Sequence, residues 1–286
     1  MKSKLKKPKK FISKSLSKLQ ISCFSSNFAE VHNNLIERLS DLNNEKKKQS
    51  MEKYMKYTTQ YRGINAPQIN IIFKNFWSEN SKKLEDLTQK KLLAETMIKS
   101  SFGEDKIIGM MIFNKIFKEI DENYMKTNVK GFFLDKHIQD WAMCDGLCSK
   151  LLKPWTLLSK EKTLIISEWC NEENIWLKRA SCVSFVTRAK HGDSEPNFVG
   201  FINILFEICD KVVKCEERFA QLGCGWLLRE ISLVEKEKTI EFLKERLNEV
   251  SSEGLRYAIE KMSNLEAKKM LELKKNSRMS IKKSNK

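Results

Sequence analysis

The chain has 286 residues, of which 41% are hydrophobic and 31% charged, and its formal net charge at pH 7 is +16. This length is enough for a substantial core in one large domain or two small ones. Ten glycines and four prolines are too few for a many-stranded sandwich, and no run approaches the roughly 18 apolar residues of a membrane span.

The positive charge is concentrated at the two ends of the chain. Residues 1–20 hold eight lysines and no acid, and residues 268–286 hold seven lysines and one arginine against Glu272, which leaves +1 for residues 21–267. We expect a disordered basic tail over 1–20, a folded domain over 21–267 and a second basic tail over 268–286. Such tails can bind polyanions without specificity, serve as nuclear import signals or simply be solvated. Neither of the two tails therefore identifies a substrate.

The eight cysteines are scattered and accompanied by only three histidines. No apolar segment follows the N-terminal lysines, as it would in a signal peptide. Reduced thiols in a nuclear or cytoplasmic protein are therefore expected.

The middle of the chain predicts helix after helix. In "NAPQINIIFKNFW", Asn65 suits a helix cap and Pro67 a first turn, and apolar residues then recur at helical spacing: Ile69, Ile72, Phe73 and Phe76. Residues 105–120 are apolar on most sides, which indicates a buried helix. The segment 138–152, "IQDWAMCDGLCSKLL", also predicts one helix, with Leu147, Leu151 and Leu152 on its buried stripe.

From residue 161 onward the predicted helices come in pairs. They cover 161–171 with 174–190, 197–214 with 216–233, and 237–249 with 253–264. Their first members start at intervals of 36 and 40 residues, close to the ~40-residue period of HEAT-type repeats. The sequence therefore predicts an all-α fold, an α-solenoid of HEAT-like helical repeats with a concave face for a long partner.

Three segments place tryptophan beside polar groups. Trp141 and Asp145 are four residues apart on one predicted helix, and Trp176 and Arg179 are three apart on another. In "LGCGWLLREIS", Gly223 and Gly225 flank Trp226, and glycine in a helix costs roughly 1 kcal/mol relative to alanine. Such glycines fit a place where another helix or a ligand backbone approaches closely. Each feature alone is also compatible with an ordinary core or surface helix.

Together these segments resemble the alkylpurine DNA glycosylase D (AlkD-like) family of HEAT-like DNA repair enzymes, over residues 30 to 262. The matching stretches are "EKYMKYTTQYRGINAPQ", "DWAMCD", "NIWLKRA" and "GWLLRE". The last two are long, ordered and correctly spaced. The resemblance implies a DNA glycosylase that removes N3- and N7-alkylated purines from double-stranded DNA, bound along the concave face.

The resemblance also implies roles for individual residues. Trp141, Asp145 and Trp226 match the catalytic aromatic–carboxylate–aromatic cluster. Arg179 matches an arginine needed near the lesion and the DNA backbone, and Tyr54 matches a tyrosine that lines the same region. One departure stands beside the site: the family often has an aromatic residue before its catalytic tryptophan, where this chain has Asp140. We expect Asp140 to point outward, since adjacent helical residues lie about 100° apart.

These residue types suit the chemistry. An N3- or N7-alkylated purine is cationic and departs neutral, so the remaining demand is to stabilise the oxocarbenium character of the sugar. The Asp145 carboxylate can do this and orient water, while the indoles add cation–π attraction. No metal or other cofactor is expected: Cys144 and Cys148 lack the further ligands of a zinc site and are interpreted as buried packing thiols.

Two other functions remain open from the sequence, and a monomer is expected in each case. One is a non-catalytic DNA-binding HEAT-repeat protein that uses its basic tails. The other is a protein-binding helical scaffold. The tryptophans and the aspartate favour the enzyme.

Overall fold

The structure is a computed structural model that describes residues 18–56, 58–84, 86–194 and 198–284. Over these residues the chain is helical, with no strand and an isolated bridge between Gln60 and Phe102. The α-helices are α1 (Lys18–Ser40), α2 (Glu45–Tyr54), α3 (Ala66–Asn80), α4 (Leu87–Lys99), α5 (Gly103–Ile116), α6 (Glu122–Tyr124), α7 (Lys130–Leu134), α8 (Trp141–Leu147), α9 (Lys153–Thr156), α10 (Lys160–Ser167), α11 (Ile175–Val183), α12 (Val186–Ala189), α13 (Phe201–Val212), α14 (Arg218–Ile231), α15 (Lys236–Glu245), α16 (Ser252–Ala258) and α17 (Asn264–Ser284).

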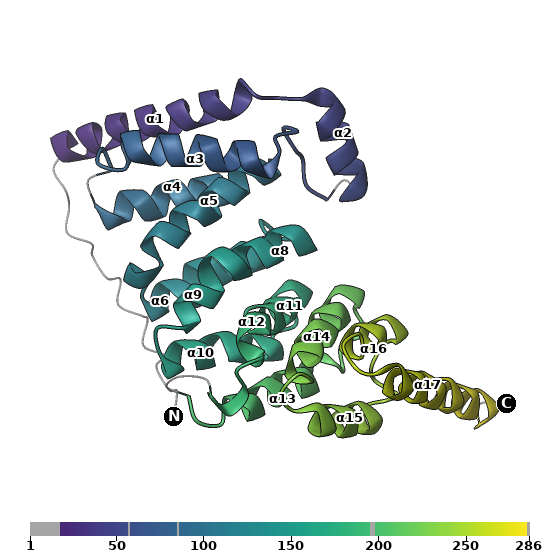
Figure 1. Ribbon diagram of the computed structural model, residues 1–286. Helices are drawn as coiled ribbons and strands as arrows, with labels where there is room; N and C mark the ends of the chain where they lie inside the picture. The colour runs from purple at the N-terminus through teal and green to yellow at the C-terminus, as the bar shows by residue number, and fades with distance from the viewer. Residues whose placement is uncertain (1–17, 57, 85, 195–197, 285–286) are drawn as a thin grey trace, which may run out of the picture.

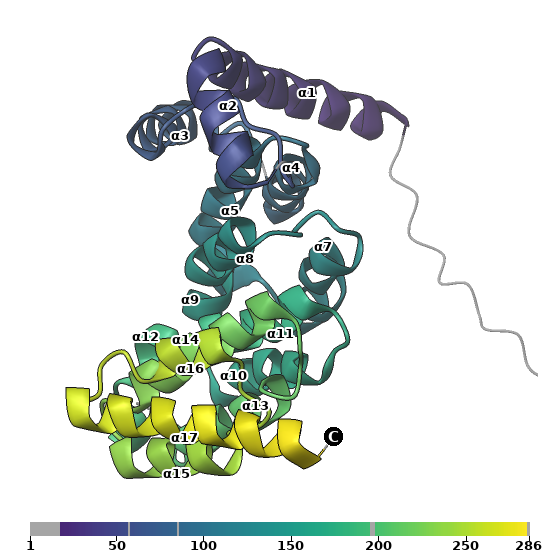
Figure 2. The ribbon, with the colours of Figure 1, turned by 90° about the vertical axis from the view of Figure 1, so that its right-hand side faces the viewer.

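The helices stack into a curved solenoid. In Figure 1 the stack runs from α1–α4 at the top, through α5 and α8, to α13–α17 at the bottom. One side of the stack is hollow, and α2, α8, α14 and α16 lie along it. Figure 2 looks into this hollow side, with α2 above and α14 and α16 below. The predicted all-α solenoid is confirmed.

The helix predicted from "NAPQINIIFKNFW" is α3, and its start follows the expected chemistry. Asn65 caps it, accepting from the backbone N–H of Gln68, whose side chain in turn accepts from the N–H of Asn65. This reciprocal capping box satisfies N–H groups that the helix itself cannot pair. The apolar stripe is buried as predicted.

The helix predicted over residues 138–152 begins later than its apolar pattern indicates. Asp140 is its N-cap, so α8 starts at Trp141 and continues through a π-helical turn, Cys148–Leu152, into α9. The leucine stripe faces the core, with Leu147, Leu151 and Leu152 fully buried.

The three predicted helix pairs are confirmed. The first pair is α10, with a 3₁₀ turn over Glu168–Asn171, against α11 and α12. The second is α13 with α14, and the third is α15 with α16. In each pair the apolar stripe turns inward, because burial of one face per helix is what holds a solenoid together.

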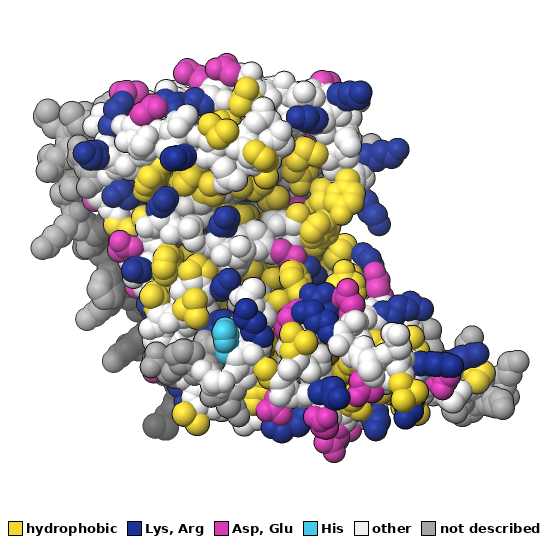
Figure 3. All heavy atoms as spheres, viewed as in Figure 1, with side chains coloured by type: hydrophobic (Ala, Val, Ile, Leu, Met, Phe, Trp, Pro, Cys, Tyr) yellow, Lys and Arg dark blue, Asp and Glu magenta, His cyan; other side chains and the backbone are white. Residues whose placement is uncertain are grey.

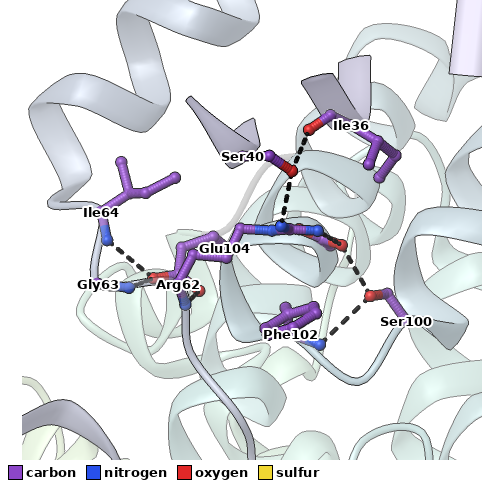
Figure 4. A network of polar contacts seen from close by, with 9 residues as sticks. Ile36, Ser40, Arg62, Gly63, Ile64, Ser100, Phe102 and Glu104 are labelled. Carbon is purple, nitrogen blue, oxygen red and sulfur yellow. Dashed lines mark hydrogen bonds and ion pairs between the residues drawn. The ribbon is translucent and has the colours of Figure 1, made fainter. Parts of the chain in front are cut away.

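A buried ion-pair network joins the α2–α3 connection to the start of α5 (Figure 4). Arg62 donates to both oxygens of Asp105, from Nε at 2.7 Å and from Nη2 at 2.9 Å. Glu104 accepts from the backbone N–H groups of Arg62, Gly63 and Ile64 at 2.9–3.0 Å. These contacts are almost free of solvent, with Arg62 8% and Asp105 1% exposed at the side chain. They therefore fix the connection that follows α2.

The predicted tails are only partly described. Residues 1–17 lie outside the described residues, and α1 begins at Lys18. Most of the predicted C-terminal tail belongs to α17, which packs through the buried Met270 and through the Lys274 ammonium on the backbone carbonyl of Leu247. Among the described helices, none has both the length and the apolarity that crossing a membrane requires.

We predict that Arg62→Ala lowers the free energy of unfolding by about 3–5 kcal/mol, because it leaves the buried Asp105 carboxylate without its cation. Urea denaturation followed by circular dichroism measures the loss. Arg38→Ala is the matched control, since the Arg38–Glu79 pair is exposed to solvent and its removal should move the midpoint little. Equal losses in the two variants would contradict a structural role for the network.

Candidate active site

The residues singled out by the sequence come together on the hollow side, in a cleft of about 760 Å³. The wall helices contribute aromatic and charged side chains. They include Tyr54 from α2, Trp141 and Asp145 from α8, Trp176 and Arg179 from α11, Phe219 and Trp226 from α14, and Tyr257 from α16. Figure 3 shows hydrophobic side chains in this hollow, with Lys and Arg side chains along its rims.

The centre of the cleft is a two-pronged ion pair between Asp145 and Arg179. Arg179 Nε donates to Asp145 Oδ1 at 2.8 Å, and Nη2 donates to Oδ2 at 2.7 Å. The third guanidinium nitrogen, Nη1, donates to the backbone carbonyl of Phe219 at 3.0 Å. This planar fork fixes the plane of the carboxylate as well as its position.

The two partners differ in their access to the cleft. The Asp145 side chain is 20% exposed, whereas the Arg179 side chain is 7% exposed. Burial raises the pKa of the Asp145 carboxyl above its ordinary value, while the hydrogen bonds from Arg179 act in the opposite direction. The carboxylate is therefore the more accessible member of the pair, and the guanidinium is the more deeply buried one.

The described contacts engage three of the five N–H groups of Arg179, so one N–H on Nη1 and one on Nη2 remain for a further acceptor. The DNA contact predicted for Arg179 stays a prediction.

Aromatic rings line the same cleft as the Asp145 carboxylate. Trp141 and Trp226 are both partly buried and line the cleft. Tyr54, 72% exposed, stands edge-on to Trp141 with 6.1 Å between ring centroids. Trp176 packs on Phe219 at 5.2 Å. A positive charge that enters the cleft would thus face a carboxylate and several π-faces.

The helix spacing behind Arg179 depends on the two glycines of α14. A Cβ on Gly223 would lie 3.2 Å from Arg179 Cγ, and a Cβ on Gly225 would lie 2.5 Å from the backbone oxygen of Gly254 in α16. The close helix approach predicted from "LGCGWLLRE" is therefore confirmed. Gly223 makes room for Arg179, and Gly225 brings α16 with Tyr257 against α14.

The orientation predicted for Asp140 is wrong. Its side chain does not point outward: the residue is 3% exposed, and its carboxylate accepts from the N–H of Met143 at 2.9 Å and from Thr59 Oγ1 at 2.5 Å. The 100° argument fails because Asp140 precedes the helix, with the extended backbone of an N-cap (φ −141°, ψ 163°).

Cys144 and Cys148 are buried thiols that face backbone carbonyls of α11, those of Trp176 and Ala180. This agrees with the packing role predicted for them. Among the described residues, no three His, Cys, Asp or Glu side chains form a group suited to a metal ion.

Some cleft residues carry no signal that the sequence reasoning used. Phe219 and Tyr257 stand in no recognised motif. Trp176 belongs to "NIWLKRA", but the resemblance implies no role for it. Arg229 could have been found, because it lies three residues after Trp226 and so shares a helix face with it. Its guanidinium lies 5.9 Å from the Trp226 ring and pairs with Glu260.

Comparisons with known proteins bear on the chain as a whole. Residues 35–262 match the family model described as DNA alkylation repair enzyme. A solved structure described as a predicted DNA alkylation repair enzyme from Enterococcus faecalis matches with a TM-score of 0.66 at 17% identity, over 78% of this chain and 97% of that chain. At this identity the likeness shows the fold. No curated protein sequence matches the chain.

We predict that Gly225→Ala lowers the free energy of unfolding by about 1–3 kcal/mol, because the new methyl group would press on the backbone of α16. Thermal unfolding checks this. Gly131→Ala in α7 is the matched control: its Cβ would meet only Asp135 Oδ2, at 3.9 Å, and alanine favours a helix. A stabilised Gly225→Ala protein would contradict the close packing of α14 on α16.

Proposed function

The chain belongs to the family of DNA alkylation repair enzymes, and on this basis we propose that it is a DNA glycosylase. The proposed reaction is hydrolysis of the N-glycosidic bond of cationic N3- or N7-alkylated purines in duplex DNA. The observation that carries the proposal is the Asp145 carboxylate, held in one plane by Arg179 at the bottom of an aromatic cleft.

The first step is departure of the base. Alkylation places a positive charge on the purine ring, so the C1′–N bond breaks with its electron pair moving to the base, which leaves neutral. No proton from the protein is needed. The deoxyribose becomes an oxocarbenium-like cation, and water adds to C1′ and gives up a proton.

Asp145 meets the charge that develops in this step. Its two oxygens accept from Arg179 but keep lone pairs on the cleft side, because a carboxylate offers about four acceptor positions. A fixed anion about one contact distance from C1′ stabilises the oxocarbenium ion more than the ground state, which is the condition for catalysis. The same carboxylate can orient the attacking water.

The indoles supply the second part of the selectivity. Trp141 and Trp226 lie on helices α8 and α14, so the π-faces come from two walls of the cleft. Cation–π attraction contributes about 0.5–2 kcal/mol per contact. An uncharged purine gains neither this attraction nor an easy departure, so the site favours charged lesions.

Arg179 acts on the reaction chiefly through Asp145 in this proposal. Its fork sets the orientation of the carboxylate, and the N–H groups that remain can reach a DNA phosphate. Three further cations line the cleft, Lys56, Arg218 and Arg229, where they suit backbone contacts that position the duplex. Because the cleft is open along the hollow side of the solenoid, the duplex can approach through its sugar-phosphate backbone.

The experiment is base release from methylated duplex DNA by the full chain. We predict release of 7-methylguanine above the spontaneous rate under single-turnover conditions. Asp145→Asn should lower the rate by about 10²-fold or more, because it removes the anion but keeps an oxygen that accepts from Arg179. Trp141→Ala and Trp226→Ala should each lower it by roughly 2- to 30-fold.

The control is binding of undamaged duplex by the same proteins, which should change little in Asp145→Asn. A wild-type protein that binds duplex in a salt-dependent manner but releases no base would instead support the non-catalytic DNA-binding function. Equal release by wild type and Asp145→Asn would remove Asp145 from the mechanism.

A further inference from the structure

Two polar contacts tie the α2–α3 connection to the first residues of α8. The Thr59 hydroxyl donates to Asp140 Oδ2 at 2.5 Å, and the Gln139 side-chain amide donates to the backbone oxygen of Thr58 at 3.2 Å. The first contact is buried, with Thr59 7% and Asp140 3% exposed. It joins residues 81 positions apart in the sequence.

The carboxylate of Asp140 serves two elements at once. Oδ2 accepts from Thr59, while Oδ1 accepts from the N–H of Met143 and so caps α8. Trp141 is the next residue, and Asp145 follows one turn later. An ordinary N-cap needs only one of its oxygens for the helix, so the second bond goes beyond capping.

The connection on the other side of this bond carries the opposite lip of the cleft. It leaves α2 directly after Tyr54, passes through Lys56 in the left-handed region (φ 52°), and is held by Thr58 Oγ1 on the backbone oxygen of Met55 at 2.8 Å. Tyr54 then meets Trp141 edge-on. The Thr59–Asp140 bond therefore joins the segment that follows Tyr54 to the residue that precedes Trp141.

We propose that Asp140 is a positioning residue that locks α8 to the α2–α3 connection and so fixes Trp141 and Asp145 relative to Tyr54. This inference rests on the proposed glycosylase function and deepens it. It also assigns a purpose to the position at which this chain departs from the aromatic residue of the family it resembles.

The charge of Asp140 has a second effect on the site. Its charge acts on Tyr61 of the α2–α3 connection, on Lys106 of α5 and on Asp145 of α8, the helix that Asp140 caps. The Lys106 ammonium donates to the backbone oxygens of Ile98 and His137 at 2.9 Å, and burial lowers its pKa to about 8 although Asp140 opposes this shift. Below that pH Lys106 is charged, and the negative charge of Asp140 favours this charged form.

The link is tested by Thr59→Val, which removes the hydroxyl and keeps the size of the side chain. We expect the single-turnover rate of 7-methylguanine release to fall about tenfold, with duplex affinity changed less than the rate, because Arg218 and Arg229, two of the three cations proposed to contact the DNA backbone, lie on α14. Thr59→Ser restores the hydroxyl and should restore the rate. Wild-type rates in Thr59→Val would overturn the proposal.

The charge is tested by Asp140→Asn, since asparagine is as good a cap as aspartate. Burial raises the pKa of Asp145, Arg179 opposes this shift, and the charge of Asp140, at the N-cap of the same helix, adds a smaller increase. Asp145 works when ionised, so the release rate falls as the pH falls through that pKa. Removing the charge should move this acidic limb to lower pH. Thr59→Val should leave the acidic limb of the pH–rate profile in place. An unmoved limb in Asp140→Asn would count against an effect of the Asp140 charge on Asp145.

Two controls are needed. The first distinguishes the positioning role of Asp140 from the loss of a helix cap, and the second measures the Thr59–Asp140 link without relying on glycosylase activity. Asp86 caps α4, accepting from the N–H of Gln89 at 2.8 Å, and Asp86→Ala should cost thermal stability without slowing release. If the wild type releases no base, the glycosylase function fails. Amide hydrogen exchange still detects the Thr59–Asp140 hydrogen bond in that case. Thr59→Val should speed exchange over residues 58–60 and 141–147. Unchanged exchange would overturn the proposal that this bond holds α8 to the α2–α3 connection.

Discussion

In the proposed reaction, a carboxylate that faces a sugar cation has to stay ionised and hold a fixed orientation. The fork of Arg179 on Asp145 meets both needs, because it supplies a neighbouring cation and fixes the carboxylate plane. The fork depends in turn on helix spacing. Arg179 lies against Gly223 of α14, where a side chain would crowd it. The position of Arg179 in its ion pair with Asp145 thus depends on Gly223, which has no side chain to crowd it.

The remaining walls of the cleft are fixed by polar contacts rather than by the repeat packing alone. At the N-terminal side, Arg62 binds Asp105, and Glu104 holds three successive N–H groups of the α2–α3 connection. Asp140 then joins that connection to α8. Buried carboxylates of α5 and at the start of α8 therefore accept hydrogen bonds from one shared connection, which supplies the donors that buried charge requires.

Much of the fold can be predicted from the sequence because helix periodicity and caps are local. The Asn65 cap with Gln68, the apolar stripe of α3 and the three C-terminal helix pairs all depend on neighbours within a few residues. The ordered motifs around Trp141, Arg179 and Trp226 also placed these residues in one site. The orientation of Asp140 could not be predicted, because it depends on where α8 begins and on Thr59, far away in the sequence. Phe219 and Tyr257 likewise reach the cleft only through tertiary packing.

In the proposed mechanism, Arg179 acts on the reaction through Asp145. A double-mutant cycle on the single-turnover rate of 7-methylguanine release tests this coupling, with wild type, Asp145→Asn, Arg179→Gln and the double variant. We expect Arg179→Gln to slow the wild type strongly but to slow Asp145→Asn little, because the anion that Arg179 orients is already gone. Rate losses that simply multiply in the double variant would contradict the claim and give Arg179 an independent role on the DNA.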